Sequence, residues 1–217
     1  MDYSIARRRM VSRHIVARGV DDEAVIRVME QVPRHLFVEE ALQSQAYTDY
    51  ALPIGEKQTI SQPYIVAVMT AALRLQRGDR VLEVGTGSGY QAAVLAQLAG
   101  QVYSVERIAT LARRARRILD SINCSNVHIR VDDGSLGWKD QAPFDAIIVT
   151  AGAPEVPQDY LTQLDVGGRL VIPVGSGERQ TLKLVECSAH GQYNETDLLA
   201  CRFVPLIGAR GWRGDGT

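Results

Sequence analysis

The sequence predicts an α/β fold with a doubly wound, mostly parallel sheet of seven strands. First, short apolar runs alternate with helical segments from about residue 80 onward, which is typical of a parallel sheet. Second, the first run leads into the glycine-rich stretch Gly85–Gly89 and then into a helix-like segment. Third, a short turn around Gly191 separates the last two runs, which indicates an antiparallel hairpin at one edge. Together these observations predict a Rossmann-like core with a C-terminal antiparallel hairpin and an N-terminal helical addition.

The size and charge of the chain limit the possible classes of protein. Its 217 residues suit a single domain, which we divide into N-terminal helices with a loop (1–62), the core (63–212) and a polar tail (213–217) expected to be disordered. The formal net charge is −1, so we expect no nucleic-acid partner. No apolar run is long enough to span a bilayer, so we expect no membrane partner. No exposed apolar stripe demands a second copy, and we expect a monomer.

Cysteine and histidine residues give no sign of a metal site. Cys124, Cys187 and Cys201 are scattered without pair spacing, which favours neither a zinc motif nor a disulfide framework. We therefore expect no metal, and a reducing, cytoplasmic location. The four histidines, to which we assign no catalytic role, are His14, His35, His128 and His190.

The N-terminal part is predicted to be helical. Asp21 or Asp22 can cap a helix that ends at Pro33, because apolar residues recur between them at helical spacing. A second helix is expected from Leu36 to Leu42. The stretch from Tyr47 to Gln62 is predicted to be a loop, and its length is typical of functional loops.

The core begins with a helix and continues with strands and helices. Ser61 can cap this first helix, with Pro63 in its first turn and apolar residues on one face. Further helices are expected at about 89–98, 108–121 and 157–164. In an open parallel sheet, ligands bind beyond the carboxyl ends of the strands, so the segments that follow the strands are the candidate site. The predicted strands are 80–84, 102–105, 127–131, 144–150, 168–174, 181–187 and 199–205.

The glycine-rich turn after the first strand predicts a nucleotide-cofactor site. Gly85, Gly87 and Gly89 lack a Cβ atom, so the turn can be tight and a ligand can approach its backbone. N–H groups at the start of the following helix would face that ligand. A dinucleotide fingerprint requires glycine or alanine where this chain has Tyr90. The turn therefore favours S-adenosylmethionine, and a plain βα turn is the alternative.

Acidic residues at the strand ends complete the predicted cofactor site. Glu106 ends the second strand and is placed to accept hydrogen bonds from both ribose hydroxyls. Asp133 follows the third strand and could accept from the adenine amino group, with Gly134 leaving room for the base. An ordinary acidic turn is the alternative at this place. Glu83 and Ser88 belong to the first strand and its turn, so they join the expected cofactor-binding set.

With these residues in place, the chain resembles the protein-L-isoaspartate (D-aspartate) O-methyltransferase family from about Pro33 to Trp212. The glycine-rich turn is shared by many class I S-adenosylmethionine-dependent methyltransferases and identifies only that class. One departure is Asp132, which stands where the family usually has glycine and adds a negative charge near the expected adenine site. The segments more specific to the family are Tyr47-Thr48-Asp49, Pro53-Ile54-Gly55, Gln58-Thr59-Ile60-Ser61-Gln62-Pro63-Tyr64, Val105-Glu106-Arg107-Ile108, Gln163-Leu164, Gly167 to Gly175, and Arg202-Phe203-Val204-Pro205-Leu206.

The resemblance implies a reaction and assigns residues to it. It implies methyl transfer from S-adenosylmethionine to the free α-carboxylate of L-isoaspartyl residues in damaged proteins or peptides, which leaves S-adenosylhomocysteine. Ser61 would be the active-site serine and would contact the substrate, a role that does not exclude the helix cap. Thr59 and Ile60 would wrap the cofactor, and Asp49 would help to shape the peptide site. The implied partners are damaged proteins that carry isoaspartyl residues.

Three other functions are compatible with parts of the sequence. One is a methyltransferase for RNA or a small metabolite. An RNA enzyme would usually have a basic surface with aromatic residues, and the sequence of this near-neutral chain does not indicate one. The segment Thr150–Pro154 also differs from the Asn-Pro-Pro-aromatic type found in amino-directed enzymes on nucleic acids. A cofactor-binding module without catalysis is another, and retention of the loop Thr59-Ile60-Ser61 argues against it. A nicotinamide dehydrogenase is disfavoured by Tyr90.

Overall fold

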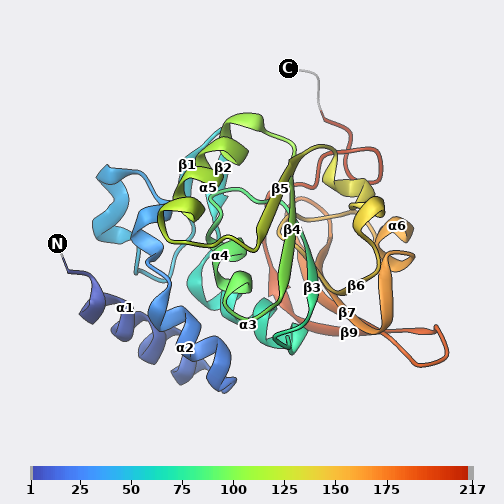
Figure 1. Ribbon diagram of the computed structural model, residues 1–217, viewed down its shortest axis with the longest axis horizontal. Helices are drawn as coiled ribbons and strands as arrows, with labels where there is room; N and C mark the ends of the chain where they lie inside the picture. Colours follow the sequence, from blue (N-terminus) through green and yellow to red (C-terminus); the bar gives the residue numbers. More distant parts are fainter. Residues whose placement is uncertain (1, 215–217) are drawn as a thin grey trace.

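Seven strands form one sheet at the centre of the computed structural model, which describes residues 2–214 (Figure 1). The tail expected to be disordered, 213–217, lies mostly outside the described residues. The strand order is β5-β4-β3-β6-β7-β8-β9. The first five of these pair in parallel, and β8 and β9 run antiparallel to their neighbours, which confirms the predicted sheet and its C-terminal hairpin. The strands are β3 (Arg80–Val84), β4 (Gln101–Glu106), β5 (Val127–Val131), β6 (Phe144–Val149), β7 (Leu164–Gly175), β8 (Gln180–Cys187) and β9 (Tyr193–Cys201).

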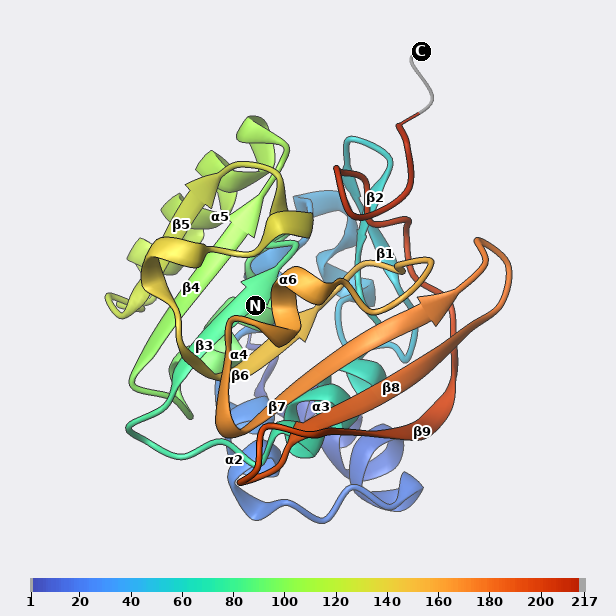
Figure 2. The same cartoon turned by 90° about the vertical axis from the view of Figure 1, so that its right-hand side faces the viewer.

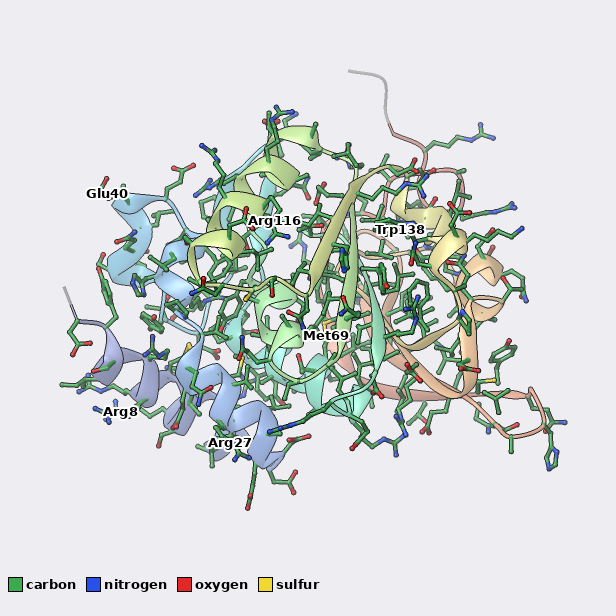
Figure 3. All side chains as sticks on the ribbon, in the orientation of Figure 1. Arg8, Arg27, Glu40, Met69, Arg116 and Trp138 are labelled. Carbon is green, nitrogen blue, oxygen red and sulfur yellow. The ribbon has the colours of Figure 1, made fainter. Side chains whose placement is uncertain are left out.

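Helices cover both faces of this sheet (Figure 2). On one face, α3, α4 and α5 share a hydrophobic core with the N-terminal helices, and Met69 of α3 is buried in it (Figure 3). On the other face, α6 and nearby loops form a second core, with Trp138 partly buried at its margin. None of the described helices is long and apolar enough to cross a membrane. The helices that flank the sheet are α3 (Pro63–Leu73), α4 (Tyr90–Ala96), α5 (Ala109–Ser121) and α6 (Gln158–Leu161).

The N-terminal helices pack onto α3 and α4 and bury the outer side of both. The Oδ1 atom of Asp22 accepts hydrogen bonds from the N–H groups of Ala24 and Val25, at 2.9 and 3.0 Å. The helix cap predicted at Asp21 or Asp22 is therefore confirmed at Asp22. The N-terminal elements are α1 (Ser4–Met10), the π-helical turn η1 (Val11–Ile15), the 3-10 turn η2 (Val16–Arg18) and α2 (Glu23–Gln31).

The prediction of a second N-terminal helix from Leu36 to Leu42 is wrong. Two short 3-10 helices occupy this region, η3 (Arg34–Phe37) and η4 (Glu40–Gln45), and an extended backbone at Val38 separates them. No residue of η4 is buried, so η4 lacks the apolar face that would stabilise a longer α-helix. In contrast, η3 buries the side chains of Arg34 and Phe37.

The loop predicted from Tyr47 to Gln62 contains a small hairpin. β1 (Leu52–Gly55) pairs antiparallel with β2 (Gln58–Ile60). Glu56 and Lys57 connect them with positive φ angles of 51° and 56°, a conformation for which hairpin turns normally use Asn or Gly. The Glu-Lys pair therefore carries no turn signal. The hairpin lies at the end of the sheet where the parallel strands terminate (Figure 2).

The last strand is displaced from its expected range, 199–205. β9 instead begins directly after the turn at Gly191 and ends at Cys201. Its first five residues, 193–197, are exposed because β9 is an edge strand, so they lack the apolar pattern by which strands are recognised. The chain after β9, residues 202–212, runs back toward the end of the sheet that carries the hairpin β1–β2, and we call it the C-terminal segment (Figure 2).

Candidate active site

A cavity lies at the carboxyl ends of the parallel strands, where the sequence predicted the cofactor site, and we call it the inner cavity. Its walls come from β2 and the residue after it, the glycine-rich turn, the ends of β4 and β6, and the C-terminal segment. The predicted site residues that line it are Thr59, Ile60, Ser61, Gly85, Gly87, Ser88, Glu106 and Gly134. The predicted site residues that lie outside its lining are Asp49, Glu83, Gly89 and Asp133.

Two glycines of the turn are required for different reasons. Gly85 has a φ of 96°, and a Cβ atom there would lie 2.4 Å from Oγ1 of Thr150. That hydroxyl is fixed because it donates a hydrogen bond to the carbonyl oxygen of Gly85, at 2.7 Å. Gly89 has a φ of 88° and precedes α4, and a Cβ atom there would lie 3.0 Å from that of Ala115 in α5. Gly85 therefore shapes the wall of the inner cavity, whereas Gly89 allows α4 and α5 to pack closely.

Glu106 holds the glycine-rich turn and also faces the inner cavity. Its Oε2 atom accepts a hydrogen bond from the N–H of Gly87 (2.8 Å), and Oε1 accepts one from the N–H of Ile108 (2.9 Å). Only 5% of the residue is exposed. Each carboxylate oxygen has a second lone pair, so Glu106 can accept hydrogen bonds from a bound ribose as well. This geometry suits the role predicted for Glu106.

Glu83 lies beneath the turn and has no exposed surface. Its Oε2 atom accepts a hydrogen bond from the hydroxyl of Ser104, which in turn lies 2.5 Å from the hydroxyl of Thr86. Burial raises the pKa of Glu83 to about 8, so the side chain is mainly protonated at neutral pH. Its Oε1 atom is buried without a hydrogen-bond partner in the described part of the chain. The structure therefore separates Glu83 from the cavity surface, and its predicted contact with the cofactor stays a prediction.

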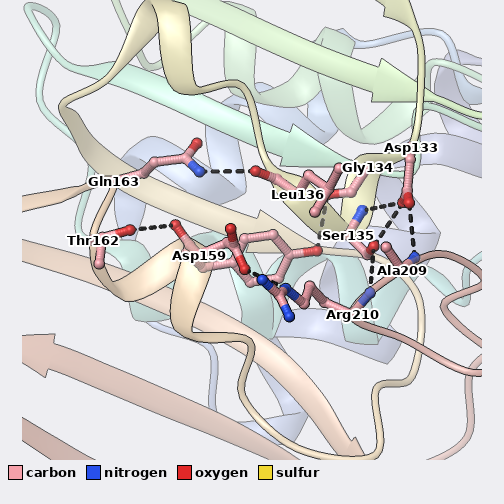
Figure 4. Close-up of polar contacts among 10 residues, drawn as sticks. Asp133, Gly134, Ser135, Leu136, Asp159, Thr162, Gln163, Ala209 and Arg210 are labelled. Carbon is pink, nitrogen blue, oxygen red and sulfur yellow. Dashed lines mark hydrogen bonds and ion pairs between the residues drawn. The ribbon is translucent and has the colours of Figure 1, made fainter.

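Asp133 is directed toward the C-terminal segment (Figure 4). Its Oδ1 atom accepts hydrogen bonds from the N–H and the hydroxyl of Ser135 (2.9 and 2.6 Å), and Oδ2 accepts one from the N–H of Ala209 (2.7 Å). Burial opposes ionisation, but these hydrogen bonds outweigh it and lower the pKa of Asp133. The Ser135 hydroxyl also accepts from the N–H of Arg210 (3.0 Å), whose side chain pairs with Asp159 (2.8 Å). The contact of Asp133 with adenine stays a prediction, and its visible function is to fasten this segment.

The C-terminal segment forms a wall of the inner cavity that could not be predicted from the sequence patterns. Leu206 and Ile207 line the cavity. The indole N–H of Trp212 donates to the carbonyl oxygen of Gly152 (2.9 Å), and the backbone N–H of Trp212 donates to that of Leu206 (2.7 Å). The family-like stretch that ends at Leu206 was the available signal for this wall, whereas nothing in the sequence pointed to the fastening role of Ser135.

Ser61 lies where the inner cavity meets a second cavity, which we call the outer cavity. Ser61, Thr59 and Val204 line both. The helix cap predicted at Ser61 is wrong, because the N-cap of α3 is Gln62 and it makes no side-chain cap. Among the residues that the structure describes, the Ser61 hydroxyl has no hydrogen-bond partner, so it is available to a ligand. The outer cavity is lined by Asp49, Tyr50, Ala51, Thr59, Ser61, Gln62, Ile65 and residues 200–204.

Asp49 belongs to the outer cavity and is held from two sides. Its Oδ2 atom accepts hydrogen bonds from Nη1 of Arg18 (2.9 Å) and from Nε2 of Gln62 (2.8 Å). Arg18 also lies over the ring of Tyr64, with its guanidinium carbon 3.4 Å from the ring centroid. Arg18, at the end of the N-terminal helices, therefore helps to fix the loop that carries Asp49, and the role of Asp49 in shaping a peptide site stays a prediction.

The inner cavity fits S-adenosylmethionine better than a dinucleotide. The ring of Tyr90 is fully buried and packs edge-on against Phe37, with centroids 5.5 Å apart, so it cannot move aside for a pyrophosphate. Glu106 offers a carboxylate to a ribose, and the glycine-rich turn offers backbone to a ligand. Between residues 2 and 214 there is no group of three His, Cys, Asp or Glu side chains that could hold a metal ion. The four histidines line neither cavity.

Comparison with known proteins identifies, over nearly the whole chain, the same family that the sequence resembles. The family model described as protein-L-isoaspartate(D-aspartate) O-methyltransferase matches residues 6–211. Protein-L-isoaspartate O-methyltransferase of Syntrophotalea carbinolica is 61% identical, with 100% of both chains covered. Protein-L-isoaspartate O-methyltransferase 2 of Geotalea uraniireducens is 57% identical, with 99% of both covered.

Solved structures agree with this chain in fold. A protein-L-isoaspartate O-methyltransferase superposes with a TM-score of 0.83 at 31% identity, covering 94% of this chain and 67% of the other. A Plasmodium falciparum β-aspartate methyltransferase in complex with S-adenosyl-L-homocysteine superposes with a TM-score of 0.81 at 25% identity, covering 93% and 98%. Sequence, fold and cavity lead to one conclusion: the chain belongs to the protein-L-isoaspartate (D-aspartate) O-methyltransferase family.

Proposed function

We propose that this chain transfers the methyl group of S-adenosylmethionine to the free α-carboxylate of L-isoaspartyl residues in damaged proteins and peptides. The observation that carries the proposal is the position of Ser61 at the junction of the inner and outer cavities. A cofactor in the inner cavity and a peptide in the outer cavity would meet at this residue. The names of the relatives at 57% and 61% identity support the same reaction.

The inner cavity would hold the cofactor through residues from three strands. Glu106 would accept from the ribose hydroxyls, Gly87 would let the ligand approach the backbone, and Gly134 would leave room for the base. Thr59 and Ile60 would close the side next to the outer cavity. When bound, S-adenosylmethionine supplies a methyl group on a positively charged sulfur, and the protein has to direct that group toward Ser61.

The substrate carboxylate needs no general base. A carboxyl group with a reference pKa of about 3.5–4 is already ionised at neutral pH. The site must therefore supply orientation and shelter from water, and orientation alone can contribute about 7–11 kcal/mol. The Ser61 hydroxyl would donate a hydrogen bond to one carboxylate oxygen or to the adjoining peptide. It would not act as a covalent nucleophile, because no base within the described chain hydrogen-bonds to it.

Methylation would start a repair that continues without the enzyme. The carbonyl carbon of the methyl ester is a better electrophile than that of the carboxylate. The next backbone nitrogen can attack it, and the succinimide closes as the C–OCH₃ bond breaks and the methoxide leaves with the amide proton as methanol. Hydrolysis of the succinimide gives normal aspartate in a fraction of the substrate molecules. The protein is therefore proposed to perform only the first step.

We further propose that the chain acts as a single domain, as a monomer in the cytoplasm, on protein rather than nucleic acid. Its three cysteines are unpaired, which suits a reducing compartment. The net charge of −1 gives no electrostatic attraction to nucleic acid.

Transfer of labelled methyl to matched peptides tests the reaction directly. The two peptides differ only in carrying isoaspartate or aspartate at one position. We expect label on the isoaspartyl peptide alone, and we expect base to release it, because a carboxyl methyl ester hydrolyses readily. Tight binding of S-adenosylhomocysteine with label on neither peptide would contradict the proposal and would favour a cofactor-binding module without this activity.

A further inference from the structure

Arg34 is a buried cation outside the residues discussed so far as parts of the site. It begins η3 and has no exposed surface. Its Nε atom donates to the carbonyl oxygen of Ala46 (2.8 Å), and its Nη2 atom donates to the carbonyl oxygen of Ser61 (2.6 Å). These two carbonyls stand at the two ends of the segment that carries Asp49 and the hairpin β1–β2. One guanidinium group therefore holds both ends of that segment.

Arg34 also connects Ser61 to the cofactor side of the site. Its guanidinium carbon lies 4.8 Å from the centroid of the ring of Tyr90, a cation–π distance. Tyr90 is the first residue of α4, directly after the glycine-rich turn, and lines the inner cavity. The Tyr90 ring is itself fixed against Phe37. Arg34 thus lies between the backbone of Ser61 and the helix that begins at the cofactor turn.

The charge of Arg34 makes this position costly for the fold. In the described part of the chain, no carboxylate forms an ion pair with Arg34, and its Nη1 atom is buried without a hydrogen-bond partner. Burial lowers the pKa of the guanidinium to about 10, so the group stays charged at neutral pH. An apolar side chain would fill the same space without the desolvation penalty. What an apolar side chain would lack is the planar fork that binds two carbonyl oxygens while stacking on a ring.

We propose that Arg34 is a positioning residue for methyl transfer, which holds the backbone of Ser61 against α4 so that the serine hydroxyl faces the substrate carboxylate. The inference rests on the proposed role of Ser61. Arg34 lines neither cavity, so it contacts neither cofactor nor peptide. Any effect of Arg34 on the reaction would therefore act through the position of Ser61.

A double-mutant cycle tests this assignment. Arg34→Lys keeps the positive charge but replaces the fork with a single ammonium group, so at most one carbonyl is held in its present geometry. We expect kcat for the isoaspartyl peptide to fall about 10- to 100-fold, as is typical of a small misplacement in an active site. The KM for S-adenosylmethionine should stay within about threefold. Arg27→Lys, the same change at an exposed arginine of α2, is the matched control and should be neutral (Figure 3).

The decisive comparison adds Ser61→Ala to the wild-type protein and to Arg34→Lys. If Arg34 acts through the Ser61 hydroxyl, Arg34→Lys should lower kcat by less than about threefold once that hydroxyl is gone. If the factors by which Arg34→Lys and Ser61→Ala lower kcat simply multiply in the double variant, the inference is wrong and Arg34 only stabilises the fold. Full kcat in Ser61→Ala alone would instead remove the proposed role of Ser61. If Arg34→Lys does not bind S-adenosylhomocysteine, the cycle is repeated with Arg34→Gln, and failure of both variants to bind would also overturn the inference.

Discussion

Glutamine in place of Glu106 is the change that probes the cofactor site most directly. The carboxylate accepts one hydrogen bond from the N–H of Gly87 and one from the N–H of Ile108, at 2.8 and 2.9 Å. A glutamine side chain has the same shape but only one oxygen, so its NH₂ group must face one of these two donors. The variant therefore loses one backbone hydrogen bond and has fewer acceptor sites left for a ribose.

The magnitude follows from the number of hydrogen bonds affected. A hydrogen bond to a charged group contributes about 1.5–3 kcal/mol. Loss of one such bond from the ribose corresponds to an affinity about 10- to 150-fold lower, because about 1.4 kcal/mol is one factor of ten. The orphaned N–H next to the turn adds a loss of protein stability of about 1–3 kcal/mol.

Calorimetric titration with S-adenosylhomocysteine measures the affinity for the cofactor product, and urea unfolding measures the free energy of unfolding. Glu40→Gln removes the same charge at an exposed position on the outer surface of the N-terminal part, and it should change neither (Figure 3). A folded Glu106→Gln protein that binds S-adenosylhomocysteine within twofold of the wild-type affinity would refute the assignment of Glu106 to the cofactor.

Three further substitutions probe separate parts of the site. Ser61→Ala should lower kcat about 100-fold with little change in the Kd of S-adenosylhomocysteine, since one hydrogen bond to the reacting group is lost; single-turnover methylation at the wild-type rate would disprove this. Gly85→Ala should lower the free energy of unfolding by about 1–3 kcal/mol, because φ is 96° and the new Cβ atom would meet Thr150. Gly177→Ala, where nothing lies within 4 Å, is the matched control in urea unfolding. Burial raises the pKa of Glu83 from 4.5 to about 8, so between these values the folded protein keeps a proton that the unfolded chain releases. The free energy of unfolding should therefore fall as pH rises from about 4.5 to 8, by up to about 1.4 kcal/mol per pH unit, and Glu83→Gln should abolish that slope. Equal slopes in the two proteins, measured by urea unfolding at pH 5.5, 6.5 and 7.5, would contradict the protonated state of Glu83.

Local patterns in the sequence predicted where the inner cavity lies, at the carboxyl ends of the parallel strands. The strand before Gly85, the turn itself and Glu106 are close together in the chain, and their geometry follows from rules for one βαβ unit. The parallel sheet could be predicted for the same reason, because its central strands are buried along almost their whole length and carry short apolar runs.

The parts that could not be predicted depend on contacts between distant segments. Asp133 carries an acidic side chain at a strand end, which indicated a base-binding role, but its partner is the N–H of Ala209 far along the chain. The first five residues of edge strand β9 are exposed to solvent, so no apolar pattern marks where the strand begins. Arg34 would normally be predicted to be exposed, and its burial is explained only by distant partners, the carbonyls of Ala46 and Ser61 and the ring of Tyr90.

The C-terminal segment has a consequence for how the protein is made. The ribosome synthesises the chain from its N-terminus, so Arg34 and the glycine-rich turn emerge long before Leu206 and Ile207. These last two residues form a wall of the inner cavity, and Trp212 and Asp133 fasten that wall. A nascent chain therefore cannot assemble its cofactor pocket while residues 206–212 are still in the ribosome. The pocket therefore reaches its final shape, and methylation can begin, only after translation of this segment is complete.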